Sequence, residues 1–229
     1  MDKLKVEQAL GMLRLQDKMN ATVNPDWLNA GYPFLRAVVV EVGEALDHYG
    51  WKWWKKQQPD LEQVQIELID ILHFMLSETL IESNGDHEAA ARLIVSQSNP
   101  DQAEIVFDGK QHGLQSGDTR QLLELLGGLA VSRRNSFPVL EACFGSCGMD
   151  WGLATRQYVS KNVLNIFRQN HGYKEGTYLK EWDGREDNVH LVEIGRQLDP
   201  SALTFADDLY AALERKYETE NQKQQMTKN

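Results

Sequence analysis

Apolar residues recur at helical spacing along most of this chain. Side chains three or four positions apart form apolar stripes, which is the pattern of helices that pack against a core. Helices are predicted over residues 3–20, 34–49, 60–82, 89–96, 119–131, 136–143, 150–169 and 201–217. No segment alternates convincingly between apolar and polar positions, so any strand is expected to be absent or very short. The pattern therefore predicts an all-α fold, a compact multi-helix bundle.

The segments between these helices divide the chain into parts of different character. Residues 21–31, 98–118 and 172–188 carry turn residues and are expected to be loops. We expect one all-α catalytic domain over residues 1–218, within which residues 83–150 form a variable middle part that can be mobile. Residues 219–229 are polar and are expected to be a disordered tail.

Two pairs of acidic residues flank the turn between the second and third predicted helices. Glu41 and Glu44 are three residues apart, as are Glu67 and Asp70, so each pair shares one face of its helix. Such pairs are usually surface charges, but here they interrupt apolar stretches on two successive helices. Four close carboxylates repel one another unless cations lie between them. The pattern predicts a site for Mg²⁺, with Mn²⁺ as a substitute.

Amide and tryptophan side chains lie on either side of the first acidic pair. Gln16 and Asn20 share a face of the first predicted helix, where they either become exposed at its end or point into a pocket. An amide carries both a donor and an acceptor and can therefore read the edge of a nucleobase. Trp51, Trp53 and Trp54 either anchor the turn against the core or form a stacking wall for a planar ligand.

A basic segment rich in glycine follows the helix predicted over residues 150–169. Arg168 lies at the end of that helix, on the face that also carries Asn162 and Asn165. Tyr173, Lys174, Lys180 and Arg185 follow, and they could hold phosphates or belong to a solvated loop.

Composition and charge narrow the class of protein. The chain has 229 residues, of which 41% are hydrophobic and 25% charged, as in an ordinary globular protein. A net charge of −10 argues against a general nucleic-acid surface. No apolar run is long enough for a membrane span, and the N-terminus lacks the core of a signal peptide, so we expect no membrane partner and a cytoplasmic location. Cys143 and Cys147 are expected to be buried free thiols.

Together, the acidic pairs and the basic segment predict metal-assisted hydrolysis of a phosphate chain. A water activated by the metal would attack, and Glu41 is the first choice for general base. Arg168, Tyr173 and Lys174 would hold the leaving phosphates and offset the charge that develops in the transition state.

The motifs resemble a known family. EVGEALDHYGWKWWK at 41–55 and ELIDILHF at 67–74 are similar to the all-α nucleoside-triphosphate pyrophosphohydrolases, the MazG-like superfamily. Together with LQDKMN at 15–20 and KNVLNIFRQNHGYKEGTYLKEWDGREDN at 161–188, they resemble more closely the dimeric, all-α dUTPases. The similarity covers most of the chain outside residues 83–150. Asp17 departs from the pattern, because some relatives have an amide there.

The resemblance implies roles for particular residues. Its metal ligands and catalytic acids would be Glu41, Glu44, Glu67 and Asp70. The base would be bound by Gln16, Asn20 and Trp54, with Trp51 as the second choice of ring. The sugar would lie against Phe74, with Asp70, Asn162 and Asn165 nearby. The phosphates would be bound by Arg168, Tyr173, Lys174, Lys180 and Asn188.

The resemblance also implies an activity and an assembly. The expected enzyme is a dUTP diphosphatase, which hydrolyses dUTP, and also dUDP, to dUMP with Mg²⁺ and works as a homodimer. One alternative is a dCTP or dCTP/dUTP pyrophosphohydrolase of the same superfamily, because the amides of Gln16 and Asn20 could turn either way. A second alternative is a nucleotide-sensing helical module without catalysis, against which the complete set of four acids argues.

Overall fold

The computed structural model describes residues 3–98, 101–115, 117–200, 202 and 204–227. The chain divides into two compact units, Met1–Ala154 and Thr155–Asn229, and each is described by itself. The single catalytic domain predicted over residues 1–218 stays a prediction.

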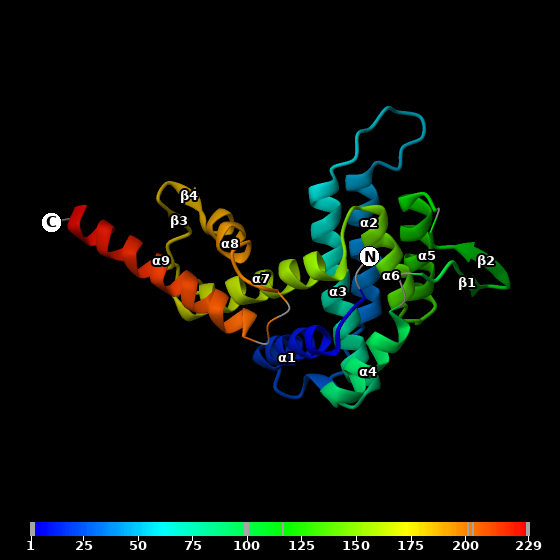
Figure 1. The fold of residues 1–229 in the computed structure, drawn as a ribbon, viewed down its shortest axis with the longest axis horizontal. Coiled ribbons are helices and arrows are strands. Elements are labelled where there is room, and N and C mark those ends of the chain that lie inside the picture. Colours follow the sequence, from blue (N-terminus) through cyan, green and yellow to red (C-terminus); the bar gives the residue numbers. More distant parts are fainter. Residues whose placement is uncertain (1–2, 99–100, 116, 201, 203, 228–229) are drawn as a thin grey trace. The chain divides into compact units, whose positions relative to one another are not determined.

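The first unit is built from helices, as the apolar pattern predicted (Figure 1). They are α1 (Val6–Val23), the short 3-10 helix η1 (Trp27–Asn29), α2 (Phe34–Tyr49), α3 (Leu61–Glu82), α4 (His87–Gln97), α5 (Thr119–Val131) and α6 (Phe137–Ser146). Helix α7 (Trp151–Asn170) begins in this unit and continues in the second. The middle part of the chain thus contributes α4, α5 and α6, and of these α5 packs on α2 while α4 and α6 pack on α3.

Helix α3 lies at the centre of the first unit. It contacts α1, α2, α4 and α6, and its side chains are buried on several faces. Helices α2 and α3 run side by side, and the tryptophan-bearing turn joins them at one end (Figure 1). Leu35, Val38 and Val42 bury the inner face of α2. This packing matters for the site because it brings the two acid-bearing helices into contact.

Local sequence signals set the ends of α2 and α3. Gly50 follows α2 with φ of +89°, a left-handed conformation that favours glycine and ends the helix. Asp60 caps α3, because its Oδ1 accepts a hydrogen bond from the backbone N–H of Gln63 at 3.2 Å. Both signals are local and can be read in the sequence.

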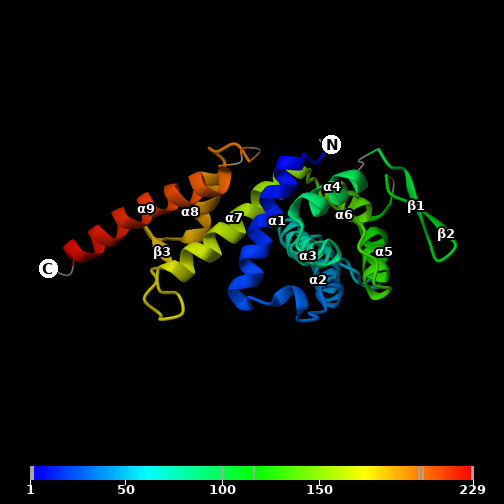
Figure 2. The ribbon, with the colours of Figure 1, turned by 90° about the horizontal axis from the view of Figure 1, so that it is seen from below.

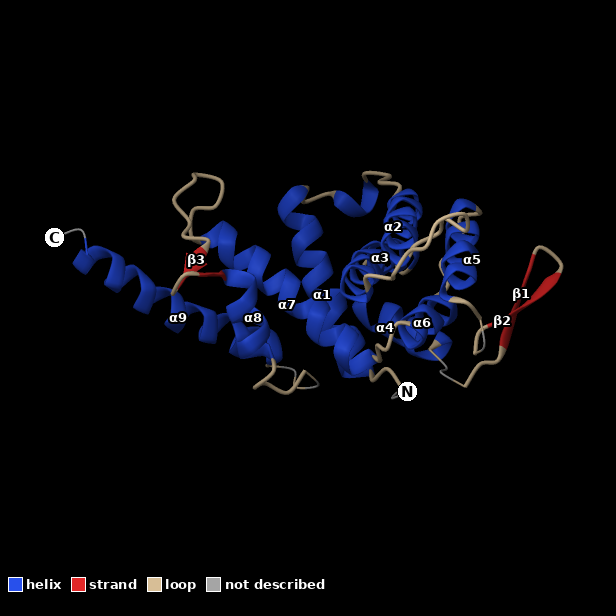
Figure 3. Cartoon of the chain, turned by 90° about the horizontal axis from the view of Figure 1, so that it is seen from above, coloured by secondary structure: helices blue, strands red, loops and turns tan. Residues whose placement is uncertain are grey.

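Two small hairpins lie in segments that were expected to be loops, and their strands are very short, as the sequence allowed. In the first unit β1 (Glu104–Phe107) pairs with β2 (Lys110–Gly113) and projects from the helices near α5 (Figure 3). In the second, β3 (Glu181–Trp182) pairs with β4 (Arg185–Glu186). Each hairpin turns on an Asp-Gly pair, Asp108-Gly109 and Asp183-Gly184, with positive φ at both residues. That is the geometry of a type I′ turn, for which Asp-Gly is a strong signal. The strands are so short that the fold remains all-α.

The second unit consists of the remainder of α7, the second hairpin, α8 (Asp187–Gly195) and α9 (Phe205–Thr227). Helices α8 and α9 lie in contact (Figure 2). Phe167 of α7 contacts Trp182 and Tyr217, with ring centroids 5.9 and 5.4 Å away, and these rings form the core of this unit. Helix α8 was not predicted, and α9 continues beyond residue 217 through most of the segment expected to be a disordered tail.

The structure tests some of the predictions made from composition and leaves others as predictions. Cys143 and Cys147 are both free and buried, as predicted. Within the described residues, no helix has the length and apolar character that a membrane crossing requires. The cytoplasmic location stays a prediction.

Candidate active site

Three of the four predicted acids meet where α2 packs on α3. Glu41 of α2 and Glu67 and Asp70 of α3 each offer one carboxylate oxygen, and these oxygens lie within 4.8 Å of one another. Oxygen ligands on opposite sides of a Mg²⁺ ion are roughly 4 Å apart, so small side-chain movements would let one cation bind all three. Glu44, the fourth predicted acid, is exposed and does not belong to the group that the described residues form. Its role as a ligand stays a prediction.

Burial and crowded negative charge together raise the pKa of Glu41. Its pKa is raised from 4.5 to about 7, first by burial, then by the charges of Asp70 and Glu44 and by a hydrogen bond with Glu67. The Glu67 side chain is buried, and its Oε1 lies 3.6 Å from Nε2 of His48. A carboxyl with this pKa is partly protonated at neutral pH, and a cation bound among the three acids would compete with that proton.

The raised pKa of Glu41 predicts how stability depends on pH when metal is removed. The folded chain binds more protons than the unfolded chain between the pKa values of 4.5 and about 7, so the free energy of unfolding falls as pH rises through this window. In EDTA, the free energy of unfolding of the wild-type protein is expected to fall, relative to that of Glu41→Gln, between about pH 4.5 and 7. Above about pH 7 the difference between the two free energies should stay constant. Urea unfolding at a series of pH values measures this, and parallel curves for the two proteins would contradict it.

The predicted base-reading amides lie between α1 and α3. Gln16 is buried, and its Oε1 lies 3.0 Å from Nδ1 of His73. Its Nε2 donates to Oδ1 of Asn20 at 3.0 Å, and Nδ2 of Asn20 donates to Oγ of Ser77 at 3.0 Å. Gln16 is therefore not exposed at the end of its helix, and both amides are held in fixed positions.

Asp17, the position that departs from the family pattern, bonds away from these amides. Its Oδ1 accepts from Nε1 of Trp27 at 3.0 Å, and its Oδ2 lies 3.0 Å from Nε2 of His87. Asp17 therefore helps to hold the loop after α1 and the start of α4.

The three tryptophans of the α2–α3 turn are exposed. Trp51, Trp53 and Trp54 expose 41%, 87% and 59% of their surface, so the expectation that they anchor the turn against the core is wrong. Their rings contact one another edge to face, and Nε1 of Trp51 donates to Oδ1 of Asp47 at 3.0 Å. Trp51 and Trp53 also line a hollow of about 320 Å³ between α2 and α5. The aromatic faces remain available for a planar ligand.

Phe74 lies one helical turn after Asp70 on α3. Its ring is only partly buried and stacks on Phe34 with centroids 6.4 Å apart and planes 29° apart. Phe34 in turn contacts Trp27 edge to face. Phe74 thus has a fixed orientation beside the acidic group, which suits the predicted packing against a sugar.

In the second unit, three predicted phosphate ligands gather around a residue that the sequence did not single out. Asp187 is fully buried and accepts hydrogen bonds from Nε and Nη2 of Arg168 at 2.8 and 2.7 Å. The same Nη2 lies 3.3 Å from Oδ1 of Asn188, and the guanidinium carbon lies 6.0 Å from the ring centroid of Tyr173. The hydrogen bonds with Asp187 are the first cause that raises the pKa of Arg168.

Tyr178 completes this arrangement from the segment after α7. Its hydroxyl donates to Oδ2 of Asp187 at 2.8 Å, and burial followed by this hydrogen bond raises its pKa. The carboxylate of Asp187 therefore has three donors and holds the guanidinium in one plane. Asp187 contacts the Arg168 guanidinium side-on, through Nε and Nη2. Nη1 of Arg168 lies on the far side, where it could bind a phosphate.

The other predicted sugar and phosphate ligands are more scattered. Asn162 is buried, and its Nδ2 donates to the backbone oxygen of Tyr158 at 3.0 Å. Nζ of Lys180 lies 3.2 Å from Oε1 of Glu186 at the surface. Lys174 is exposed and Asn165 is partly buried. Their roles stay predictions.

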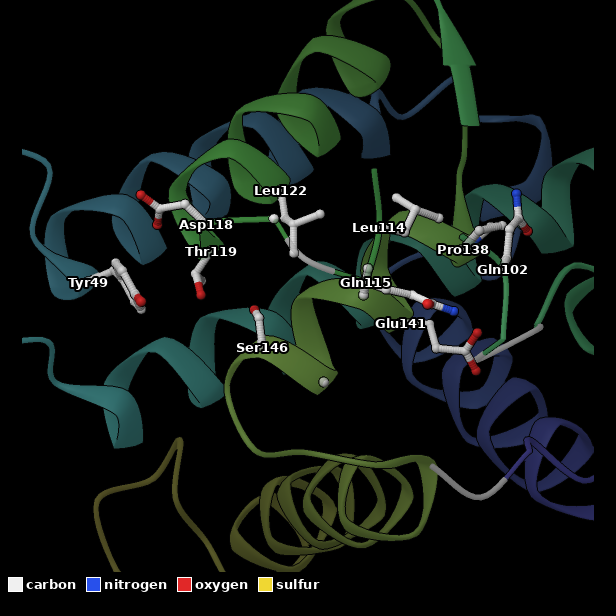
Figure 4. Close-up of a pocket in the computed structure, with 13 residues that line it drawn as sticks. Tyr49, Gln102, Leu114, Gln115, Asp118, Thr119, Leu122, Pro138, Glu141 and Ser146 are labelled. Atoms are coloured by element: carbon white, nitrogen blue, oxygen red, sulfur yellow. The ribbon is translucent and has the colours of Figure 1, made fainter. Parts of the chain in front are cut away.

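A separate cavity of about 470 Å³ lies between the start of α5 and helix α6 (Figure 4). Its lining includes Tyr49, Thr119, Glu141 and Ser146. None of the predicted site residues belongs to its described lining. The residues predicted from the sequence therefore lie outside this cavity.

Comparison with known proteins agrees with the resemblance seen in the sequence. A family model described as dUTPase matches residues 9–173, which is more than half of the chain. The match includes the acidic group, the amides, the tryptophan turn and Arg168. No curated protein matches the chain.

Proposed function

Because this chain belongs to the all-α dUTPase family and is a dUTP diphosphatase, we propose that it hydrolyses both dUTP and dUDP to dUMP in a Mg²⁺-dependent reaction. Water would attack the phosphate chain, and the anhydride bond between the α- and β-phosphates would break. The products would be dUMP and pyrophosphate from dUTP, and dUMP and phosphate from dUDP.

One observation carries the proposal more than any other. Two consecutive helices bring Glu41, Glu67 and Asp70 together, and burial followed by the neighbouring negative charges raises the pKa of Glu41 to about 7. Carboxylates that serve only as surface charges spread into water, because close approach costs free energy. Such crowding supports a site shaped for a cation of high charge.

The donor set fits Mg²⁺. The three carboxylates are hard oxygen ligands, and Glu44 lies near enough for its charge to act on Glu41, which makes it the proposed fourth ligand. When bound, Mg²⁺ neutralises charge on phosphate oxygens and activates water. Mn²⁺ has the same preference for oxygen and is the proposed substitute.

Residues of this chain would supply proton transfer and substrate binding. Glu41 is the proposed general base, since a pKa near neutrality matches a proton acceptor to the working pH. Gln16, Asn20 and a ring of the tryptophan turn would bind the base, and Phe74 would lie against the deoxyribose. Arg168, Tyr173 and Lys174 would hold the phosphate chain.

A nucleotide panel with and without Mg²⁺ tests the proposal. We expect dUTP and dUDP to be hydrolysed with Mg²⁺ and turnover to disappear in EDTA, with pyrophosphate and phosphate measured separately. UTP, dTTP and dCTP are the matched controls. Faster turnover of dCTP than of dUTP would favour the related pyrophosphohydrolase, while undiminished turnover in EDTA would contradict the metal role.

We also propose that the enzyme is a homodimer, as the family resemblance implies. Light scattering coupled to size exclusion measures the mass of the particle. A mass that matches one chain at micromolar concentration would contradict the dimer.

A further inference from the structure

A chain of hydrogen bonds connects the two proposed base-reading amides to the backbone of α3. Gln16 and Asn20 lie four residues apart on α1, and His73 and Ser77 lie four apart on α3. Oγ of Ser77 donates to the backbone oxygen of His73 at 3.0 Å. From Ser77 the chain continues through Nδ2 of Asn20 and Nε2 of Gln16 to Nδ1 of His73, and each link is 3.0 Å long.

The direction of this chain is determined at the Ser77 end. A backbone carbonyl only accepts, and a serine hydroxyl has a single proton, so Ser77 Oγ must accept from Asn20 while it donates to His73 O. The nitrogen of the Asn20 amide therefore faces Ser77, and its oxygen faces Gln16. Each later link follows from the one before it.

The direction of the hydrogen bonds is also determined at His73. Because the Asn20 oxygen faces Gln16, the Gln16 nitrogen must face Asn20 and its oxygen must face His73. Nδ1 of His73 is then the protonated nitrogen. Asn20 is partly buried, but Ser77 is fully buried and Gln16 and His73 are more than nine-tenths buried, so a mismatch between Gln16 and His73 would leave polar groups without water.

Orientation of an amide matters for a pyrimidine. Uracil presents the donor N3–H beside the acceptor O4, whereas cytosine presents the acceptor N3 beside a donor amino group. An amide that pairs with one of these edges pairs with the other only after its oxygen and nitrogen exchange places. A locked amide therefore accepts one base and rejects the other, because mispairing leaves buried polar groups unsatisfied.

We propose that Ser77 and His73 are specificity-determining residues, which lock the amides of Asn20 and Gln16 in one orientation. We assign this orientation to uracil, and against cytosine, because dUTP is the substrate of the family. The inference rests on the proposed binding of the base by Gln16 and Asn20. Ser77 and His73 act as positioning residues and need not touch the base themselves.

The test is the ratio of kcat/KM for dUTP to kcat/KM for dCTP. Ser77→Ala removes the hydroxyl that fixes the direction and leaves no bulk to accommodate. We expect this ratio to fall by about tenfold or more, chiefly through faster turnover of dCTP. His73→Gln is the second variant, because a glutamine can present either a donor or an acceptor to Gln16, and its ratio should fall too.

Thr79→Val is the matched control. Thr79 is as buried as Ser77, and its hydroxyl also donates to the backbone oxygen four residues earlier, Met75 O, at 2.8 Å. It accepts a hydrogen bond from Asn135, however, and not from Gln16 or Asn20. Its ratio should equal that of wild type. An unchanged ratio in both Ser77→Ala and His73→Gln would overturn the inference, as would an equal loss of turnover on both nucleotides.

The outcomes also separate this inference from the proposed function. A wild-type enzyme that fails to hydrolyse dUTP with Mg²⁺ would contradict the proposed function itself. A wild-type enzyme that hydrolyses dUTP but does not discriminate against dCTP would overturn the lock alone.

Discussion

Glu41→Gln is expected to lower kcat for dUTP by about 10²–10⁴-fold, the range associated with loss of a general base. Glutamine has nearly the same shape, but it carries no charge and cannot accept the proton of the attacking water. Because Glu41 suffers repulsion from Asp70 and Glu44, its removal should also make the metal-free protein more stable at pH 8. Activity and stability are thus expected to change in opposite directions, which a folding defect could not produce.

Steady-state kinetics at saturating Mg²⁺ and urea unfolding in EDTA measure these two effects. Glu62→Gln is the matched control, since Glu62 is an exposed acid on α3 outside the acidic group, and we expect its kcat to match wild type. Wild-type turnover by a folded Glu41→Gln protein would show that the acidic group has been assigned the wrong role.

The second large effect is expected at Asp187. Asp187→Asn removes the charge that pairs with Arg168, and the loss of one partner of a buried ion pair lowers the free energy of unfolding by about 3 kcal/mol. We take the lower end of that range because the Arg168 side chain is 17% exposed and can still reach water. Since Asp187 also orients the guanidinium, KM for dUTP should rise.

A double-mutant cycle separates these contributions. Asp187→Asn and Arg168→Met, alone and together, should show a coupling free energy of about 1.5 kcal/mol or more, because the two residues share two short hydrogen bonds. Glu186→Gln is the control: its pair with Lys180 is at the surface and should contribute less than about 1 kcal/mol. Additive effects in the cycle would show that Asp187 does not position Arg168.

Sequence reasoning succeeded where a local signal decides the structure. The bounds of α2 and α5 are those predicted, and α3 begins at the cap residue Asp60. Glu41, Glu67 and Asp70 could be paired in advance because their spacing places them on facing sides of helices joined by a short turn. Apolar spacing and capping act within a few residues, so a single sequence displays them.

The misses have different physical causes. The hairpins escaped because strands of two to four residues show no alternation, although the Asp-Gly pairs at 108–109 and 183–184 were a readable turn signal. Helix α9 continues into a polar segment because glutamate, glutamine and lysine are good helix formers, so polarity alone does not imply disorder. The role of Asp187 depends on a contact 19 residues away, which no spacing rule reveals.

The tryptophans of this chain fall into a buried class and an exposed class, and the fluorescence of each class would report a different event. Trp27, Trp151 and Trp182 are almost fully buried, whereas Trp51, Trp53 and Trp54 are exposed within one turn. An indole in water emits at longer wavelength than one in an apolar core. A nucleotide stacked on the turn would therefore alter the red side of the emission band, and unfolding would alter the blue side. The unlabelled protein carries separate optical signals for binding and for folding.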